Sequence, residues 1–233
     1  VPANLQVGLI GLGMMGRNHL RILGNLPGIT LAGVYDPLGD STGEVKTGLM
    51  VDAISKFIPK NLDYCVIAVP TVKHEEVALE VIDMGVNVLV EKPVSHSPES
   101  AINIQSALAN AHLVGGVGQI ERYNPALAKA RELIQDGLLG NIYEVFTRRQ
   151  GWYPTRITDV GVVKDLATHD IDLTSWITNK KYKKVSAFTG YHSGKQHEDI
   201  VSITGMLEDE VVTNHIIDWL SPNKIRETRI LGE

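Results

Sequence analysis

The sequence predicts an α/β protein that begins with a doubly wound parallel sheet and continues into a second α/β part. In the first half of the 233 residues, apolar runs typical of strands alternate with amphipathic runs typical of helices. A glycine-rich segment, GLGMMG, joins the first strand to the first helix. The second half ends in runs that alternate like antiparallel strands. We therefore expect two domains, residues 1–118 and 119–233.

The first half is expected to supply five parallel strands and the helices between them. Tyr64–Val69 is a continuous apolar run, which is typical of a strand covered on both faces. Residues 39–48 carry three glycines where a crossover helix should stand, so this connection is expected to be irregular or to lack residues. The expected strands are Leu5–Ile10, Thr30–Tyr35, Tyr64–Val69, Asn87–Val90 and Leu113–Val117, and the expected helices are Met14–Asn25, Val72–Met84 and Ser97–Ala111.

The glycines of the first strand-to-helix turn fit the pattern G-x-G-x-x-G. Gly11 would permit the tight turn, Gly13 would let a pyrophosphate approach the backbone, and Gly16 would let the helix lie close to the strand. Met14 and Met15 then open a helix whose free N–H groups and positive dipole end suit phosphates. The alternative is an ordinary helix-capping turn, but the flanking strand and helix favour a dinucleotide site.

Asp36 indicates which dinucleotide binds. It ends the second strand, where a carboxylate can accept hydrogen bonds from the adenosine ribose hydroxyls. A 2′-phosphate would face this carboxylate, and Pro37 and Leu38 follow it instead of an arginine. We therefore expect NAD rather than NADP as the cofactor.

Two further strand ends carry polar residues, at the edge where open α/β sheets bind ligands. Lys92 is followed by proline, which can hold the lysine near the nicotinamide; a surface lysine paired with Glu91 is an equally good interpretation of the spacing alone. The first of these ends is the segment AVPTVKH, residues 68–74, and the candidate cofactor residues at the second are Glu91, Lys92 and Pro93.

The second half reads as helices and strands around a loop at residues 151–161. The run of Lys180, Lys181, Lys183 and Lys184 is interpreted as a solvated turn. The expected helices are Asn124–Asp136 and Asp165–Ile177, and the expected strands are Ile142–Arg149, Val185–Tyr191, Ile200–Leu207, Val211–Asp218 and Ile225–Leu231.

Asp165 and His169 are four residues apart and would share one face of their helix. A carboxylate there can fix the imidazole tautomer and raise its basicity, as proton transfer near neutral pH requires. The spacing alone favours a core histidine and a helix-start aspartate. A metal site at HDID is not expected, because Asp170 projects away from His169 and no second histidine lies nearby in sequence.

Aromatic and basic residues around the loop are candidates for a substrate pocket, since arginine can hold a phosphate or carboxylate and an aromatic face can stack on a sugar or uracil ring. For each residue, a surface or core role remains open. These candidates are Tyr123, Asn124, Arg148, Arg149, Trp152, Tyr153 and Arg156.

Three segments together resemble the glucose-fructose oxidoreductase and inositol dehydrogenase family: GLGMMGRNHLRIL, AVPTVKHEEVALEVIDMGVNVLVEKPV and DVGVVKDLATHDIDL. The resemblance implies an N-terminal Rossmann domain and a C-terminal domain with an open, mostly antiparallel sheet. One face of that sheet lines the substrate site, and the other often makes a homodimer or homotetramer. It further implies that Lys92 is the active-site lysine, that Pro93 follows a cis peptide bond, and that Asp165 and His169 face the substrate. By the same resemblance, Pro70, Thr71 and His74 are expected to lie in the loop on the cofactor side.

Within that family, GQIERYNPAL and RITDVGVVKDLATHDID look most like nucleotide-sugar 3-dehydrogenases of the UDP-N-acetylglucosamine type. The family continues through further strands, so the second domain is expected to be short or truncated. We expect an NAD-dependent oxidation of a secondary alcohol on a sugar ring to a ketone. The alternatives are an inositol or free-hexose dehydrogenase, a dinucleotide-binding regulatory protein without chemistry, and a scaffold subunit. Retention of Lys92, Asp165 and His169 counts against the regulatory protein.

Composition limits the partners and the compartment. The chain is 43% hydrophobic and 21% charged, as expected of a globular protein. Its net charge of −5 argues against nucleic-acid and anionic-membrane partners. The lone Cys65 fits a reducing compartment, and neither a signal peptide nor a membrane-length apolar run is visible. We therefore expect a cytoplasmic protein that acts on a small molecule.

Overall fold

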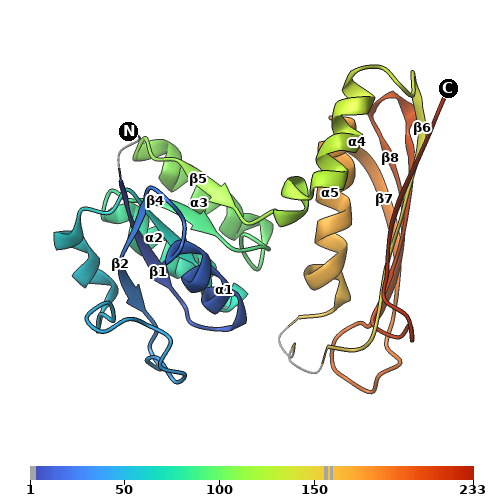
Figure 1. The fold of residues 1–233 in the computed structure, drawn as a ribbon. Helices are drawn as coiled ribbons and strands as arrows, with labels where there is room; N and C mark the ends of the chain where they lie inside the picture. The colour runs from blue at the N-terminus through green and yellow to red at the C-terminus, as the bar shows by residue number, and fades with distance from the viewer. Residues whose placement is uncertain (1–3, 155–156, 158–159) are drawn as a thin grey trace. The chain divides into compact units, whose positions relative to one another are not determined.

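The structure is a computed structural model, and it describes residues 4–154, 157 and 160–233. The chain divides into two compact units, Val1–Gly118 and Gln119–Glu233, called here the first and second units (Figure 1). Among the described residues, no helix is both long and apolar enough to cross a membrane.

The first unit contains a five-stranded sheet in the order β2-β1-β3-β4-β5, with every neighbouring pair parallel. The predicted doubly wound sheet is confirmed. Its strands are β1 (Leu5–Ile10), β2 (Ile29–Tyr35), β3 (Tyr64–Ile67), β4 (Asn87–Val90) and β5 (Gly115–Val117), and its helices are α1 (Met14–Leu23), α2 (His74–Asp83) and α3 (Pro98–Asn110).

The strands of this sheet are buried on both faces because successive side chains point in opposite directions. In β1, Leu9 packs in a cluster with Leu20 and Leu23 of α1, whereas its neighbour Ile10 packs with residues of α2 and α3 such as Ile104. Two helical layers thus cover the sheet, and the loops at the carboxyl ends of the strands remain available for a ligand.

The connection between β2 and β3 is irregular, as its glycines predicted. Residues 36–53 form no helix, and a 3₁₀ helix follows at Ile54–Lys60. Met50 pairs with Val34 of β2 in a single parallel bridge. With Met50 counted as a rudimentary strand outside β2, the sheet has the 3-2-1-4-5-6 order of dinucleotide-binding folds.

The second unit contains a five-stranded mixed sheet in the order β10-β6-β9-β8-β7. Only the β6–β9 pair is parallel, so the expected mostly antiparallel sheet is confirmed. Helices α4 and α5 lie along one face of it (Figure 1). The strands are β6 (Ile142–Gln150), β7 (Tyr182–Gly190), β8 (Ile200–Leu207), β9 (Val212–Asp218) and β10 (Ile225–Gly232), and the helices are α4 (Pro125–Gln135) and α5 (Thr168–Thr178).

Two predictions for the second unit were wrong in part. The expected helix from Asp165 begins as a π-helical turn, Val163–Ala167, and becomes α-helical only at Thr168. The lysine run is not simply a solvated turn, because Lys183 and Lys184 lie within β7 and Lys180 forms an ion pair with Asp209. Pairing with β8 extends β7 toward its start, since Tyr182 lies opposite Leu207.

Candidate functional site

The glycine turn of the first unit has three distinct local geometries. Gly11 has φ +98°, in the left-handed region, and a side chain there would overlap the carbonyl of Ala68. A side chain at Gly16 would overlap the carbonyl oxygen of Gly11, so this glycine lets α1 pack against the turn. Around Gly13, no described residue other than its two chain neighbours lies within 4 Å of the place a Cβ would occupy. The turn is therefore tight at Gly11 and Gly16 and open at Gly13.

Asp36 lies against this turn. One carboxylate oxygen accepts the backbone N–H of Leu12 at 2.7 Å, and the other accepts that of Leu38 at 2.8 Å. Because each carboxylate oxygen has two lone pairs, both can still accept a ribose hydroxyl. The structure thus brings together the glycine turn, the start of α1 at Met14 and Met15, and the acidic end of β2.

These residues fit a dinucleotide. The open space at Gly13 lies at the N-terminus of α1, where unpaired N–H groups and the positive end of the helix dipole favour phosphates. Asp36 supplies the acceptor that ribose hydroxyls require. Gly13 and Met14 are exposed, so a ligand can reach them.

The loops after β3 and β4 are tied together by His74. Its Nδ1 lies 2.8 Å from the carbonyl oxygen of Pro93, and its Nε2 lies 3.0 Å from that of Val69. The imidazole is only 1% exposed. His74, predicted to contact the cofactor, therefore supports two loops in this structure. Of the other two residues predicted in this loop, Pro70 is exposed and Thr71 is half-buried.

The Glu-Lys-Pro segment follows β4. The peptide bond between Lys92 and Pro93 is cis, as the resemblance implied. Oε1 of Glu91 lies 2.7 Å from Nε2 of His19 on α1. Its Oε2 accepts the backbone N–H of Lys92 at 3.1 Å. Glu91 thus links the lysine loop to the helix that begins at the glycine turn.

In the second unit, Asp165 and His169 lie on either side of the change from π to α helix. Asp165 is half-buried within the π-helical turn, and its N–H donates to the carbonyl of Gly161 at 3.1 Å. His169 is the second residue of α5 and is 7% exposed. π-Helical turns are rare and occur often at functional sites.

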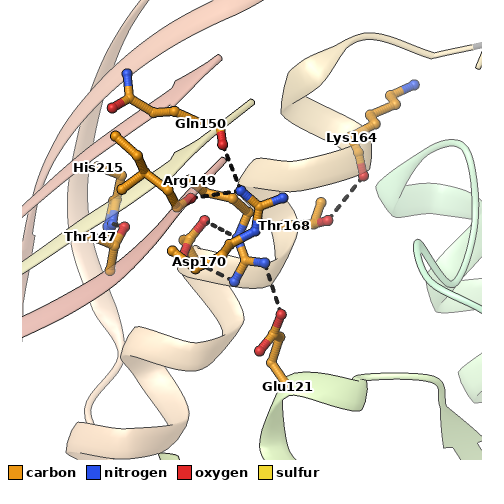
Figure 2. Close-up of polar contacts among 10 residues, drawn as sticks. Glu121, Thr147, Arg149, Gln150, Lys164, Thr168, Asp170 and His215 are labelled. Carbon is orange, nitrogen blue, oxygen red and sulfur yellow. Dashed lines mark hydrogen bonds and ion pairs between the residues drawn. The ribbon is translucent and has the colours of Figure 1, made fainter. Parts of the chain in front are cut away.

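An ion-pair network fixes the first turn of α5 to β6 (Figure 2). Nε of Arg149 donates to Asp170 at 2.8 Å, and its NH1 donates to Glu121 at 2.8 Å. Burial alone lowers the pKa of Arg149, but the charges of Asp170 and Glu121 raise it, and the net shift is upward. Arg149, considered above as a substrate contact, is thus held in an internal network, and its partner Asp170 directly follows His169 in sequence.

The other predicted substrate residues of the second unit have different surroundings. Tyr123 is 85% exposed, and Asn124 caps α4 by accepting the N–H of Ala126 at 3.1 Å, which accounts for an asparagine there without a substrate. Arg148 donates to Gln150. Arg156 lies outside the described residues.

The two aromatic candidates after β6 differ. Trp152 is 75% exposed, and its indole N–H donates to the carbonyl of Pro222, so one edge is fixed while the ring remains accessible. Tyr153 packs edge-on against Trp219 with ring centroids 5.4 Å apart, which is a core contact. Of the two, Trp152 is the better placed to stack on a ligand.

A cavity of about 580 Å³ lies within the second unit. Its lining includes Asn124, Arg148 and Arg149, together with Asp170, Lys224 and Arg226. Three of the predicted substrate residues therefore meet at one cavity, whereas Trp152, Asp165 and His169 do not line it.

Sequence reasoning missed His19, Glu121 and Glu198. His19 lies three residues after Gly16, a spacing that could have marked it as facing the strand ends. Glu121 and Glu198 carry no local signal, since their partners Arg149 and Val163 are distant in sequence. Over the part of the chain that the structure describes, no group of three or more His, Cys, Asp or Glu residues could hold a metal ion.

Two family profiles match the chain. Residues 5–119 match a profile described as an oxidoreductase family with an NAD-binding Rossmann fold. Residues 127–233 match the profile of the GFO/IDH/MocA C-terminal domain.

Relatives of known activity resemble the chain over both units. The UDP-N-acetylglucosamine 3-dehydrogenase of Acidithiobacillus ferrooxidans is 31% identical over 232 residues, which are 99% of this chain and 72% of that protein. A solved structure with this name and organism has a TM-score of 0.86 and 26% identity, and the match covers 98% of this chain and 72% of that one.

The sequence alignments with inositol 2-dehydrogenases are shorter. Inositol 2-dehydrogenase 4 of Saccharopolyspora erythraea is 28% identical over 190 residues, which are 78% of this chain. The chain spans 56% and 60% of the length of two inositol 2-dehydrogenases of that organism.

Proposed function

Because the chain belongs to the GFO/IDH/MocA oxidoreductase family, we propose that it belongs to an enzyme that oxidises a secondary alcohol on a sugar ring to a ketone. The proposed substrate is a nucleotide sugar, and the proposed oxidant is NAD.

The observation that carries the substrate class is the extent of sequence similarity. The nucleotide-sugar dehydrogenase aligns with 99% of the chain, whereas the inositol dehydrogenase aligns with 78%. The longer match includes essentially all of the second unit, which in this family carries the substrate residues. An inositol or a free hexose is the alternative substrate within the same chemistry.

NAD, when bound, would supply the hydride acceptor. The chain's own contribution is to bind and orient it. The space at Gly13 and the N-terminus of α1 suit the pyrophosphate, and Asp36 suits the adenosine ribose. Pro70, Thr71 and the loop of Lys92 follow β3 and β4, at the edge where such sheets bind ligands.

We assign the proton chemistry to three residues. Lys92 is a cation that can polarise the reacting hydroxyl oxygen, and His169 can accept the proton that the hydroxyl loses. Asp165 can fix the tautomer of His169. A protein that only bound a dinucleotide would need none of these three, which supports an enzyme over a regulatory protein.

The function is tested by turnover. The purified protein is mixed with NAD and, in separate reactions, with UDP-sugars, free hexoses and inositols, and NADH is followed by absorbance. We expect NADH formation with a UDP-sugar and much less with the other two classes. Turnover confined to inositols would overturn the substrate class, and NAD binding without turnover on any class would favour the regulatory protein.

We also propose that the chain assembles with copies of itself, as the resemblance implies. Strand β7 lies at an edge of its sheet, and its Val185 and Phe188 are 56% and 79% exposed. Exposed apolar side chains on an edge strand are usually covered by a partner. Light scattering coupled to gel filtration should give the mass of a dimer or tetramer, and a monomer at micromolar concentration would contradict the proposal.

A further inference from the structure

The segment that leads into α5 is held at its start by Glu198, which lies in the loop between β7 and β8. The N–H of Val162 donates to the backbone carbonyl of Glu198 at 3.0 Å. The N–H of Val163 donates to Oε1 of the Glu198 side chain at 3.1 Å. The first N–H groups of a helix have no partner within it, so Glu198 satisfies two of these donors from outside.

Gly161 shows that this approach is close. A Cβ at Gly161 would overlap the carboxylate of Glu198, so a residue with a side chain would displace the glutamate. Gly161 also accepts the N–H of Asp165 at 3.1 Å. The carboxylate of Glu198 therefore packs directly on the residue that holds the backbone of Asp165.

The residue after Glu198 gives it a fixed support. Asp199 is fully buried, and its Oδ2 accepts the N–H groups of His192 and Ser193 at 2.6 and 2.5 Å. Its backbone N–H donates to Gly190 of β7, and its carbonyl accepts from Trp219. Through its neighbour Asp199, Glu198 is thus anchored to β7 and to the residue that follows β9, although it belongs to a loop.

We propose that Glu198 is a positioning residue for Asp165 and His169. It caps the π-helical turn that contains Asp165, and that turn continues into α5 with His169 as its second residue. A negative charge at the start of a helix also interacts favourably with the helix dipole. This inference rests on the proposed function, because positioning matters to activity only if His169 accepts the proton.

The proposal is tested with two variants and a matched control. Glu198→Ala removes the acceptor for Val163, whereas Glu198→Gln keeps an oxygen that can accept the same N–H. We expect Glu198→Ala to lower kcat about tenfold to a hundredfold with an unchanged KM for NAD, since small misplacements of catalytic groups have effects of this size. Glu198→Gln should recover most of the loss. Glu132→Ala, which removes an exposed glutamate of α4, should behave like the unmodified protein.

A purely structural role is separated by the pH profile of kcat and by the imidazole resonances of His169 in NMR spectra. If Glu198 positions His169, Glu198→Ala shifts both the profile and the resonances at temperatures where the protein is folded. If Glu198→Ala lowers only the melting temperature and leaves kcat, the profile and the resonances unchanged, the proposal is wrong.

The NMR measurement also separates this inference from the proposed function, because it needs no substrate. Shifted His169 resonances in a protein that oxidises no sugar would retain the positioning role of Glu198 and reject the proposed activity. Unshifted resonances in a protein that does oxidise a sugar would reject the positioning role of Glu198 and retain the proposed activity.

Discussion

The imidazole of His74 is joined to the carbonyl oxygen of Pro93 by a hydrogen bond of 2.8 Å. Its other nitrogen lies 3.0 Å from the carbonyl oxygen of Val69. Val69 follows β3, and Pro93 follows Lys92 after β4, so one buried side chain sets the spacing of two loops that we propose face the cofactor.

Replacement of His74 by alanine should therefore disturb both the fold and the loop of Lys92. It would leave a half-buried carbonyl oxygen of these loops without its hydrogen-bond donor and would empty a buried site, so we expect the free energy of unfolding to fall by about 2 kcal/mol. NAD should also bind more weakly. Urea unfolding and a fluorescence titration with NAD measure the two effects. Lys73→Ala is the control, because its ion pair with Glu76 is exposed and contributes little.

The glycines of the turn should separate binding from folding. Gly13→Val fills the open space proposed for the pyrophosphate, so it should abolish NAD binding and leave a cooperative melt. Gly16→Val would overlap the carbonyl of Gly11 and should destabilise the fold itself. Thermal melts with and without NAD distinguish the two. Normal NAD binding by Gly13→Val would show that the phosphate site lies elsewhere.

Asp36 should set the choice of cofactor. We expect NAD to bind more tightly than NADP, because the 2′-phosphate of NADP would face a carboxylate. Asp36→Ala should narrow the difference by weakening NAD. Titration of each variant with both cofactors gives the four dissociation constants, and equal affinities in the unmodified protein would rule out this role.

His215 should make stability depend on pH. It is fully buried between the hydroxyl groups of Thr147 and Tyr182, each 2.8 Å from a ring nitrogen, and burial lowers its pKa from 6.5 to about 4. Between these two values the unfolded chain binds a proton that the folded protein does not. The contribution of neutral His215 to the free energy of unfolding is therefore complete above about pH 6.5. It is lost as the pH falls toward 4, by up to about 3 kcal/mol, because the proton binds more tightly to the unfolded chain.

Urea unfolding at several pH values tests this dependence. His215→Gln should be less stable at pH 7, and its stability should fall less steeply between pH 6.5 and 4. His112→Asn is the control, since His112 is exposed and its φ of +54° suits asparagine. If the free energy of unfolding falls equally with pH in the unmodified protein and in His215→Gln, His215 is not the cause of the pH dependence.

Local patterns predicted most of the fold. Two strands have the expected bounds: the apolar run Leu5–Ile10 and the alternating run Ile200–Leu207. Their bounds could be predicted because the pattern of apolar residues along a strand depends on whether one or both of its faces are buried. The start of β7 at Tyr182 was missed, since it depends on pairing with Leu207 of another strand. The π-helical turn at Val163–Ala167 was missed for a similar reason, as its first N–H groups are satisfied by a residue of a distant loop.

In the candidate site too, local features could be predicted from the sequence, whereas contacts between distant residues could not. The glycine spacing and Asp36 were predictable because a dinucleotide turn is a local structure with a fixed spacing. The role of Arg149 was not, because its partners Asp170 and Glu121 lie 21 and 28 residues away in sequence. The sequence alone does not distinguish an arginine that pairs with buried carboxylates from one that binds a phosphate.

Cofactor binding alone does not distinguish an enzyme from a regulatory protein, whereas loss of turnover in variants of the proposed catalytic residues does. Oxidation of an alcohol requires that its hydroxyl proton be removed, and an unassisted hydroxyl is a very weak acid. If His169 accepts that proton and Lys92 polarises the oxygen, His169→Ala and Lys92→Ala should each lose about a hundredfold to ten-thousandfold in kcat. Asp165→Asn should lose less, because Asp165 would orient His169 without taking the proton.

The affinity for NAD should change little in all three variants, and His112→Asn should retain full turnover. Steady-state kinetics with a UDP-sugar, beside NAD titrations, measures each quantity. Near-normal kcat in both alanine variants would remove these residues from the mechanism and favour a protein that binds NAD without chemistry.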